Sequence, residues 1–241
     1  MQPAIHALIP AAGQSVRFGG TTYKQYAHLL GKPVIAHSID TVQRHRAISA
    51  VTVALAPDDG IYGELIRPEY PEVRTVAGGD CRARTVMNGL EDIRAADPGC
   101  RWVLVHDAAR PCLSPELLDS LILEGLQADD GAILAMPVSD TLKRAGDEGR
   151  IERTEDREGL WAAQTPQLFP LDALMDNLSA ALRFGAPPTD EAEAMERAGC
   201  RPLLVRGSST NIKITHPDDL PLAEALMRSR LKAQRPAGHA A

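Results

Sequence analysis

The chain has 241 residues, of which 44% are hydrophobic and 24% are charged. This composition excludes wholesale disorder and is typical of one large globular domain. A formal net charge of −6 argues against a general nucleic-acid-binding or anionic-membrane surface, so an anionic substrate would need a local cluster of cations.

No apolar run has the length of a membrane span. The first apolar run begins at Ile5 and leaves no room for a leader peptide after Met1. The four cysteines are scattered, without a C-x-x-C pair, so they indicate neither a zinc site nor a disulfide scaffold. We therefore expect a cytoplasmic protein.

Apolar runs typical of β-strands alternate with segments of helical periodicity. The expected strands are residues 5–9, 50–56, 73–77, 102–105, 132–138, 202–205 and 211–214. One-sided apolar faces predict helices in between, formed by Val34, Ile35, Ser38, Ile39 and Val42, by Val86, Leu90 and Ile93, and by Leu117, Leu118, Leu121 and Ile122. This order predicts an α/β domain in which helices cover both faces of a mostly parallel sheet. Ligands bind beyond the carboxyl ends of such strands.

The loop after the first expected strand has the composition of a phosphate site. Residues 10–13 read Pro-Ala-Ala-Gly, and two cations, Arg17 and Lys24, follow seven positions apart. Small residues let backbone N–H groups approach a phosphate, and a nearby cation neutralises its charge. Phe18 stands where a P-loop needs glycine, and the dinucleotide-binding glycine pattern is absent. The stretch predicts a triphosphate site of another type.

The segment 78–85 joins another expected strand to a helix and begins with Gly78 and Gly79. Its glycines permit close backbone approach, and the following helix N-terminus favours an anion. Thr85 would then meet a phosphate, while Asp80 and Arg82 would bind a base or brace the loop. The alternative is a helix-capping turn led by Asp80.

The strand expected at 102–105 is followed by His106, Asp107, small residues and Arg110. A carboxylate in this place suits a hydrated divalent cation or a ribose hydroxyl, and a turn-forming acid is the alternative. His106 is isolated on its strand, so we expect it to be structural.

The segment 139–159 breaks the alternation of strands and helices. It is charged, and Gly146 and Gly149 lie in its middle, flanked by Leu142 and Ile151. This pattern predicts an exposed β-hairpin. Because an excursion of this length is usually functional, we expect an arm that packs on a second subunit.

Lys213 lies in the strand expected at 211–214, where a solvated lysine is the default interpretation. Local sequence likewise gives no function to Thr165, and Thr189 would serve as the N-cap of a helix that begins at Asp190.

The last helix is expected from about Pro217 to about Lys232. The tail, residues 233–241, is expected to be frayed, so residues 1–232 would form a single domain.

Together these segments resemble the 2-C-methyl-D-erythritol 4-phosphate cytidylyltransferase family from about residue 4 to residue 228. The resemblance is carried, in order, by Pro10-Ala11-Ala12-Gly13, Arg17, Lys24-Gln25-Tyr26, Gly78-Gly79-Asp80, Arg82, His106-Asp107-Ala108-Ala109-Arg110-Pro111, Thr165-Pro166-Gln167 and Asn211-Ile212-Lys213. It implies a Rossmann-like nucleotidyltransferase fold. The implied reaction joins CTP to 2-C-methyl-D-erythritol 4-phosphate in isoprenoid biosynthesis. The products would be 4-diphosphocytidyl-2-C-methyl-D-erythritol and pyrophosphate, with Mg²⁺ as cofactor.

The resemblance also implies a role for each site residue. Arg17 and Lys24 would stabilise charge on the triphosphate, and Arg157 and Lys213 would position the attacking phosphate. The implied CTP site contains Ala11, Ala12, Gly13, Gly79, Asp80 and Thr85, with Arg82 beside them. The implied acceptor site contains Asp107, Ala108, Arg110, Thr141, Thr165 and Thr189. Mg²⁺ would be held mainly by CTP phosphates, with Asp107 as its candidate protein ligand, and the arm at 139–159 would form a homodimer.

The implied chemistry needs no general base. A phosphate monoester has a second pKa of about 6, so it is already largely dianionic near neutrality. What remains is to hold two anions in line and to neutralise the departing pyrophosphate. The nearest rival is a cytidylyltransferase for ribitol 5-phosphate or another polyol phosphate. A non-catalytic nucleotide sensor is the alternative of another class, and the presence of Arg17, Lys24 and Lys213 argues against it.

Overall fold

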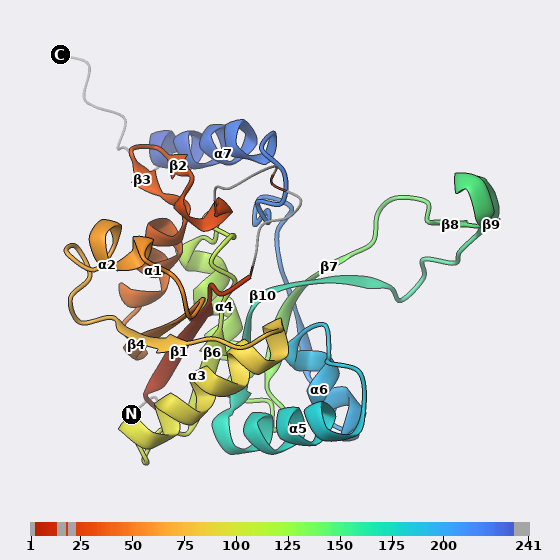
Figure 1. The fold of residues 1–241 in the computed structure, drawn as a ribbon. Coiled ribbons are helices and arrows are strands. Elements are labelled where there is room, and N and C mark those ends of the chain that lie inside the picture. Colours follow the sequence, from red (N-terminus) through yellow and green to blue (C-terminus); the bar gives the residue numbers. More distant parts are fainter. Residues whose placement is uncertain (1–2, 14–17, 19–22, 234–241) are drawn as a thin grey trace.

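The computed structural model describes residues 3–13, 18 and 23–233. At its centre is a seven-stranded sheet in the order β11-β7-β10-β6-β1-β4-β5 (Figure 1). Only β10 runs antiparallel to its neighbours in this sheet. The strands are β1 (Ile5–Pro10), β4 (Ile48–Leu55), β5 (Arg74–Ala77), β6 (Trp102–Val105), β7 (Ala132–Pro137), β10 (Trp161–Pro170) and β11 (Leu203–Arg206). The predicted mostly parallel α/β fold is confirmed.

Two apolar layers hold the helices on opposite faces of the sheet. On one face, α1 and α4 pack against a cluster that includes Ala7 and Ile9. On the other, α3, α5 and α6 pack against a cluster that includes Leu8. Successive strand residues point to opposite faces, so the apolar side chains of β1, which is interrupted only by the buried His6, serve both layers. The bounds are α1 (Val34–Gln43), α2 (Ile61–Leu65), α3 (Arg82–Ala96), α4 (Pro115–Gly125), α5 (Leu171–Phe184), α6 (Glu191–Arg197) and α7 (Asp219–Ala233).

Two expectations about strands were wrong. Residues 211–214 alternate in polarity but join no sheet. Instead, the loop after β6 binds them, because Arg110 donates to the carbonyl of Asn211 (2.7 Å) and the N–H of Ile214 donates to the carbonyl of Ala109 (2.8 Å). No strand was expected at β10, whose pairing register shifts between Ala163 and Gln167.

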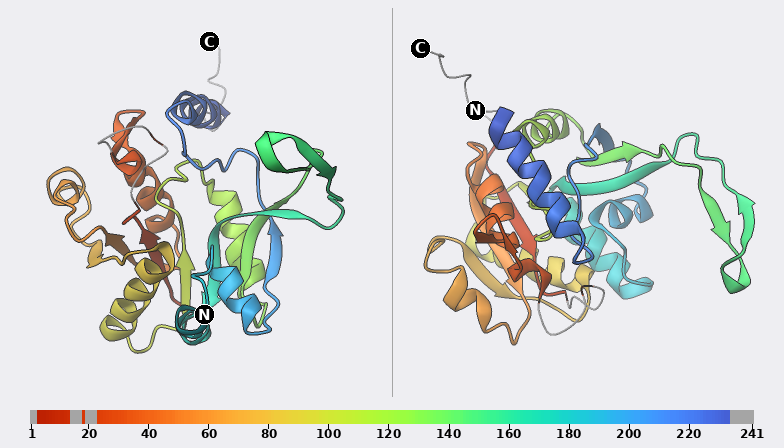
Figure 2. Two further views of the ribbon diagram at one scale, coloured as in Figure 1. Left: turned by 45° about the vertical axis from the view of Figure 1, so that its right-hand side comes forward. Right: turned by 90° about the horizontal axis from the view of Figure 1, so that it is seen from above.

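The charged segment 139–159 forms the expected hairpin and projects from the body of the molecule (Figures 1 and 2). Its strands are β8 (Lys143–Ala145) and β9 (Ile151–Thr154), which pair antiparallel across the short 3-10 turn η3 (Asp147–Gly149). Gly149 has φ +70°, a conformation that glycine adopts without strain. The short strands β2 (His28–Leu29) and β3 (Lys32–Pro33) form a separate pair near α7.

The last helix begins at Asp219, two residues after the expected start, and ends at Ala233. The tail, residues 234–241, lies outside the described residues. None of the helices in the described part of the chain is both long and apolar enough to cross a membrane.

A buried histidine on β1 makes the stability of the fold depend on pH. His6 is 2% exposed, and its Nε2 lies 2.9 Å from Oγ1 of Thr52 on β4. Burial, aided by the charge of Arg74, lowers the pKa of His6 from 6.5 to about 4. The unfolded chain therefore binds more protons than the folded chain between these pH values, so stability is lost as pH falls through this window.

We expect His6→Gln to remove this contribution. The variant is less stable at pH 7, but its deficit relative to the wild type narrows by about 2 kcal/mol between pH 7 and pH 5. Urea unfolding of both proteins at each pH measures the difference between their free energies of unfolding. The contributions of titratable groups that the two proteins share cancel in this difference. A deficit that stays constant with pH would contradict the buried neutral state of His6.

Candidate active site

A cavity of about 490 Å³ lies at the edge of the sheet where β1 and β6 end. The loops after these strands and after β5 form its walls, as expected for a parallel α/β sheet. The cavity brings together segments far apart in the chain. Its lining includes the predicted residues Ala11, Ala12, Gly13, Lys24, Gly79, Asp80, Arg82, Thr85, Asp107, Ala108 and Lys213.

The loop after β1 is held from beneath by Gln25. This side chain is 3% exposed, and its Nε2 donates to the carbonyl of Ala11 at 2.9 Å. Gln25 belongs to the 3-10 turn η2 (Lys24–Tyr26), so the same contact keeps Lys24 beside the loop. No local sequence pattern predicts this function for Gln25, because nothing near it in the chain shows that its side chain turns back toward residue 11. Arg17 lies outside the described residues.

The glycines of the second loop are needed for close packing. A Cβ at Gly78 would lie 2.5 Å from Cβ of Ala12, so a larger residue would separate the two loops. A Cβ at Gly79 would lie 2.1 Å from Cγ of Arg84. The hydroxyl of Thr85 accepts a hydrogen bond from the N–H of Gly79 at 3.1 Å.

The N-cap of α3 is Cys81, whose Sγ accepts from the N–H of Arg84 at 3.5 Å. The alternative interpretation of Asp80 as the cap was therefore wrong. The side chain of Asp80 does not cap the helix, and Asp80 lines the cavity of about 490 Å³.

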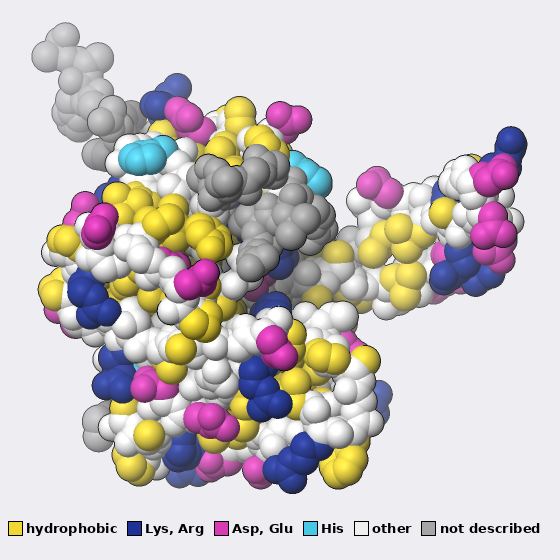
Figure 3. Space-filling view, in the orientation of Figure 1, with side chains coloured by type: hydrophobic (Ala, Val, Ile, Leu, Met, Phe, Trp, Pro, Cys, Tyr) yellow, Lys and Arg dark blue, Asp and Glu magenta, His cyan; other side chains and the backbone are white. Residues whose placement is uncertain are grey.

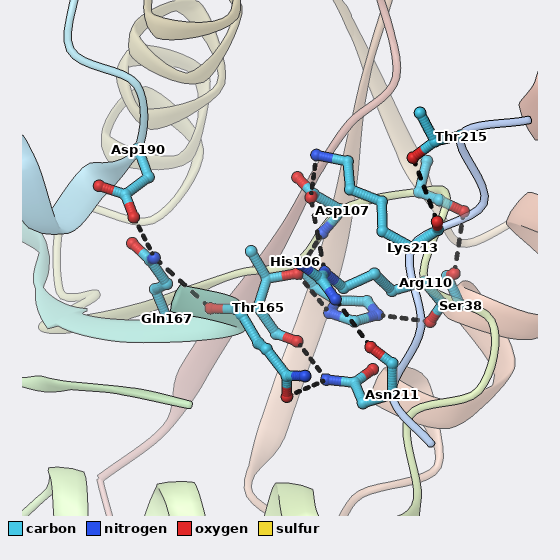
Figure 4. A network of polar contacts seen from close by, with 12 residues as sticks. Ser38, His106, Asp107, Arg110, Thr165, Gln167, Asp190, Asn211, Lys213 and Thr215 are labelled. Atoms are coloured by element: carbon cyan, nitrogen blue, oxygen red, sulfur yellow. Dashed lines mark hydrogen bonds and ion pairs between the residues drawn. The ribbon is translucent and has the colours of Figure 1, made fainter. Parts of the chain in front are cut away.

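Asp107 is a buried carboxylate surrounded by three cations, of which Figure 4 shows Arg110 and Lys213. Its Oδ2 lies 2.7 Å from Nζ of Lys213 and 3.7 Å from Nε of Arg110, and its Oδ1 accepts from Arg82 at 3.3 Å. Burial alone would raise the pKa of Asp107, but the charges of Arg82 and Lys213 outweigh it and hold that pKa well below its usual value. Asp107 is therefore an anion that orders the surrounding cations.

The described residues contain no cluster of three or more His, Cys, Asp or Glu able to hold a metal ion. Mg²⁺ commonly binds one or two carboxylates together with substrate phosphates. Asp107 fits such a site only as a single carboxylate, because both of its oxygens already face cations. Phosphate oxygens would have to supply the other ligands.

A second cavity, of about 170 Å³, adjoins the first. The two share Arg82, Asp107 and Lys213, so one wall separates them. The rest of the second lining includes the predicted residues Arg110, Thr165 and Thr189.

Thr165 and Asn211 connect the walls of this second cavity. The hydroxyl of Thr165 accepts from the N–H of Asp107 at 3.0 Å and lies 3.2 Å from Nδ1 of His106. The amide of Asn211 donates to the carbonyl of Thr165 at 2.9 Å, which holds the segment that carries Lys213 (Figure 4). Thr165 stands where the register of β10 shifts, and such irregularities often redirect a side chain beside a site.

His106 is structural, as expected. It is fully buried, and its Nε2 lies 3.1 Å from the carbonyl of Arg110. Burial lowers the pKa of His106 to about 4, so the ring is neutral near neutrality and supports the loop around Asp107.

Thr189 lines the second cavity but does not cap α6, contrary to expectation. The N-cap is Asp190, whose Oδ1 accepts from the N–H of Glu193 at 2.9 Å. The hydroxyl of Thr189 instead donates to Oε2 of Glu193 at 2.8 Å. Asp190, one position after Thr189, therefore caps the helix with its carboxylate in place of the threonine hydroxyl.

Two predicted residues, Thr141 and Arg157, lie apart from both cavities. Both are exposed on the arm, and neither lines either cavity. The guanidinium of Arg157 donates to the carbonyl of Ser139. Within one described chain, the arm and the cavities are therefore separate.

Two adjoining cavities at the carboxyl edge of this sheet share a wall that contains two cations and one carboxylate, and comparison with known proteins shows that the chain is a nucleotidyltransferase. A family model described as 2-C-methyl-D-erythritol 4-phosphate cytidylyltransferase matches residues 5–229. The protein of that name from Shewanella oneidensis is 49% identical over 225 residues, which cover 93% of this chain and 89% of that protein. The one from Haemophilus influenzae strain PittGG is 46% identical over 232 residues, 96% of this chain and 100% of that protein.

Solved structures agree with this result. A crystal structure of 4-diphosphocytidyl-2C-methyl-D-erythritol synthase matches with a TM-score of 0.83 and 40% identity, covering 94% of this chain and all of that one. The 2-C-methyl-D-erythritol 4-phosphate cytidylyltransferase from Thermus thermophilus gives a TM-score of 0.77 and 31% identity, covering 95% of this chain and 100% of the other. The chain belongs to the 2-C-methyl-D-erythritol 4-phosphate cytidylyltransferase family.

Proposed function

We propose that the enzyme transfers the cytidylyl group of CTP to 2-C-methyl-D-erythritol 4-phosphate, with the residues around its two cavities in defined roles. The observation that carries this assignment of roles is the shared wall of Arg82, Asp107 and Lys213. CTP occupies the larger cavity and the acceptor phosphate the smaller one. The two reacting phosphates then meet at the wall, which is the positioning that phosphoryl transfer requires.

The reaction is an in-line displacement at the α-phosphorus of CTP. An oxygen of the acceptor phosphate forms the new bond, and the bond to the β-phosphate oxygen breaks, so its electron pair leaves with pyrophosphate. Arg17 and Lys24 neutralise the charge that grows on that leaving group, and Lys213 orients the attacking phosphate. Mg²⁺ bound to the phosphates, with Asp107 as candidate ligand, would neutralise part of the triphosphate charge.

The proposal includes a homodimer in which each arm completes the acceptor site of the other subunit. Exposed apolar side chains support this, because Ile151 in the arm and Leu160 and Trp161 at its base are 67%, 43% and 37% exposed. Figure 3 shows hydrophobic side chains along the arm between its charged tip and the body. A second subunit would cover them and receive Arg157 and Thr141.

An assay of substrate preference tests the activity. Pyrophosphate release is measured with each of the four NTPs, with methylerythritol phosphate or ribitol 5-phosphate as acceptor, and with or without Mg²⁺. We expect turnover with CTP and methylerythritol phosphate that depends on Mg²⁺. A strong preference for ribitol 5-phosphate would reject the acceptor, and turnover with no acceptor would reject the transfer reaction.

A further inference from the structure

Glu191 is a buried carboxylate that the mechanism above does not use. It is the first residue of α6, and its side chain is 1% exposed. Both of its oxygens accept hydrogen bonds from Arg82, with Nη1 to Oε1 at 2.6 Å and Nη2 to Oε2 at 2.9 Å. A bidentate pair fixes the plane of the guanidinium as well as its position.

Arg82 connects Glu191 to the wall between the cavities. It is the first residue of α3, and its Nη2 also donates to Oδ1 of Asp107. The other oxygen of Asp107 contacts Lys213. Glu191, Arg82, Asp107 and Lys213 therefore form a row of alternating charge, which ends on the lysine proposed to orient the acceptor phosphate. Of the two functions considered for Arg82, these contacts favour bracing the loop over binding the nucleotide base.

We infer that Glu191 is a positioning residue for the acceptor phosphate, an inference that rests on the proposed function. By holding the Arg82 guanidinium, Glu191 limits it to one oxygen of Asp107 and leaves the other for Lys213. Without Glu191, the carboxylate still in contact with Arg82 is Asp107, and a guanidinium favours binding both oxygens of a carboxylate. Lys213 would then lose the contact that orients it.

A purely electrostatic role for Glu191 makes the opposite prediction. Its negative charge lies close to the acceptor cavity, so removing that charge would strengthen the attraction for a phosphate dianion. A positioning role instead predicts that the same change lowers kcat/KM for the acceptor. The sign of the effect on the acceptor therefore separates the two roles.

Steady-state kinetics of Glu191→Gln, with each substrate varied in turn, test the inference. We expect kcat/KM for methylerythritol phosphate to fall by about tenfold or more, as when a residue that orients a functional group is removed, while KM for CTP stays within about twofold. Glu196→Gln makes the same charge change at an exposed residue of α6 and is expected to leave the kinetics unchanged.

An unchanged or higher kcat/KM for the acceptor would overturn the inference. A KM for CTP that rises as much as KM for the acceptor would also overturn it, because such a change marks a damaged fold. A wild-type enzyme inactive with these substrates would instead reject the proposed function.

The double variant Arg82→Met/Glu191→Gln is the second test and also serves if the single variant folds poorly. Replacing both partners of a buried ion pair is often tolerated, whereas removing one is costly. Because no guanidinium remains to bind Asp107, we expect the double variant to regain part of the acceptor kcat/KM that the single variant loses. Thermal unfolding establishes that each variant is folded. If the folded double variant is as poor as the single variant or poorer, Glu191 does not act through Arg82.

Discussion

Replacing Lys24 by alanine is expected to lower kcat by about 10²–10³-fold, the cost of losing one charge-stabilising donor in a transition state. Lys24 lies on the wall of the larger cavity, next to the loop after β1. Negative charge grows on pyrophosphate as its bond to the α-phosphorus breaks, so a cation there stabilises the transition state more than bound CTP. The fold should survive, because the side chain of Gln25 donates to the carbonyl of Ala11 and holds the loop after β1.

The measurement is kcat and KM for CTP, together with thermal unfolding of the variant. Lys32→Ala is the matched control, because Lys32 pairs with Asp40 at 3.1 Å and lines neither of the two cavities. Arg17→Ala is expected to resemble Lys24→Ala. A folded Lys24→Ala enzyme with nearly normal kcat would remove Lys24 from the mechanism.

The central sheet could be predicted because buried parallel strands have a strong local signal. Residues 5–10 and 102–105 are nearly continuous apolar runs, which a strand covered on both faces requires. β10 lacks such a signal, since its first three residues are exposed and its pairing is interrupted near Pro166. Residues 211–214 gave a false signal because their alternation reflects packing of Ile214 against α7 rather than pairing in a sheet.

Three loops of the candidate site could be located because each of them directly follows an apolar run, whereas Thr165, Thr189 and Lys213 entered the site only through the family resemblance. Its internal contacts could not be predicted, because they join distant parts of the chain. The pair of Arg82 and Glu191 spans 109 residues, and Asn211 contacts Thr165 across 46. In the sequence alone, Glu191 is one of several acids at the start of a short helix.

Mixing two inactive variants is expected to restore activity if the arm completes the neighbouring site. Arg157 lies on the arm, apart from both cavities of its own chain, whereas Lys24 lines one of them. In the proposed homodimer, each active site therefore takes Lys24 from one subunit and Arg157 from the other. Lys24→Ala and Arg157→Ala should each be inactive alone, because every site in either homodimer lacks one cation.

After subunit exchange, each heterodimer contains one doubly damaged site and one intact site. With random pairing of equal amounts, the intact sites approach about a quarter of the total, so turnover should return to about that fraction of the wild-type value. If one chain supplied both residues, no mixed dimer would contain an intact site and the mixture would stay inactive. Exchange is followed with subunits that carry different tags, and a mixture of Lys24→Ala with Arg17→Ala is the control that should remain inactive. Confirmed exchange without recovered turnover would refute the shared site even if the protein is a dimer. The arm would then contribute to dimer assembly but would supply no residue to the neighbouring active site.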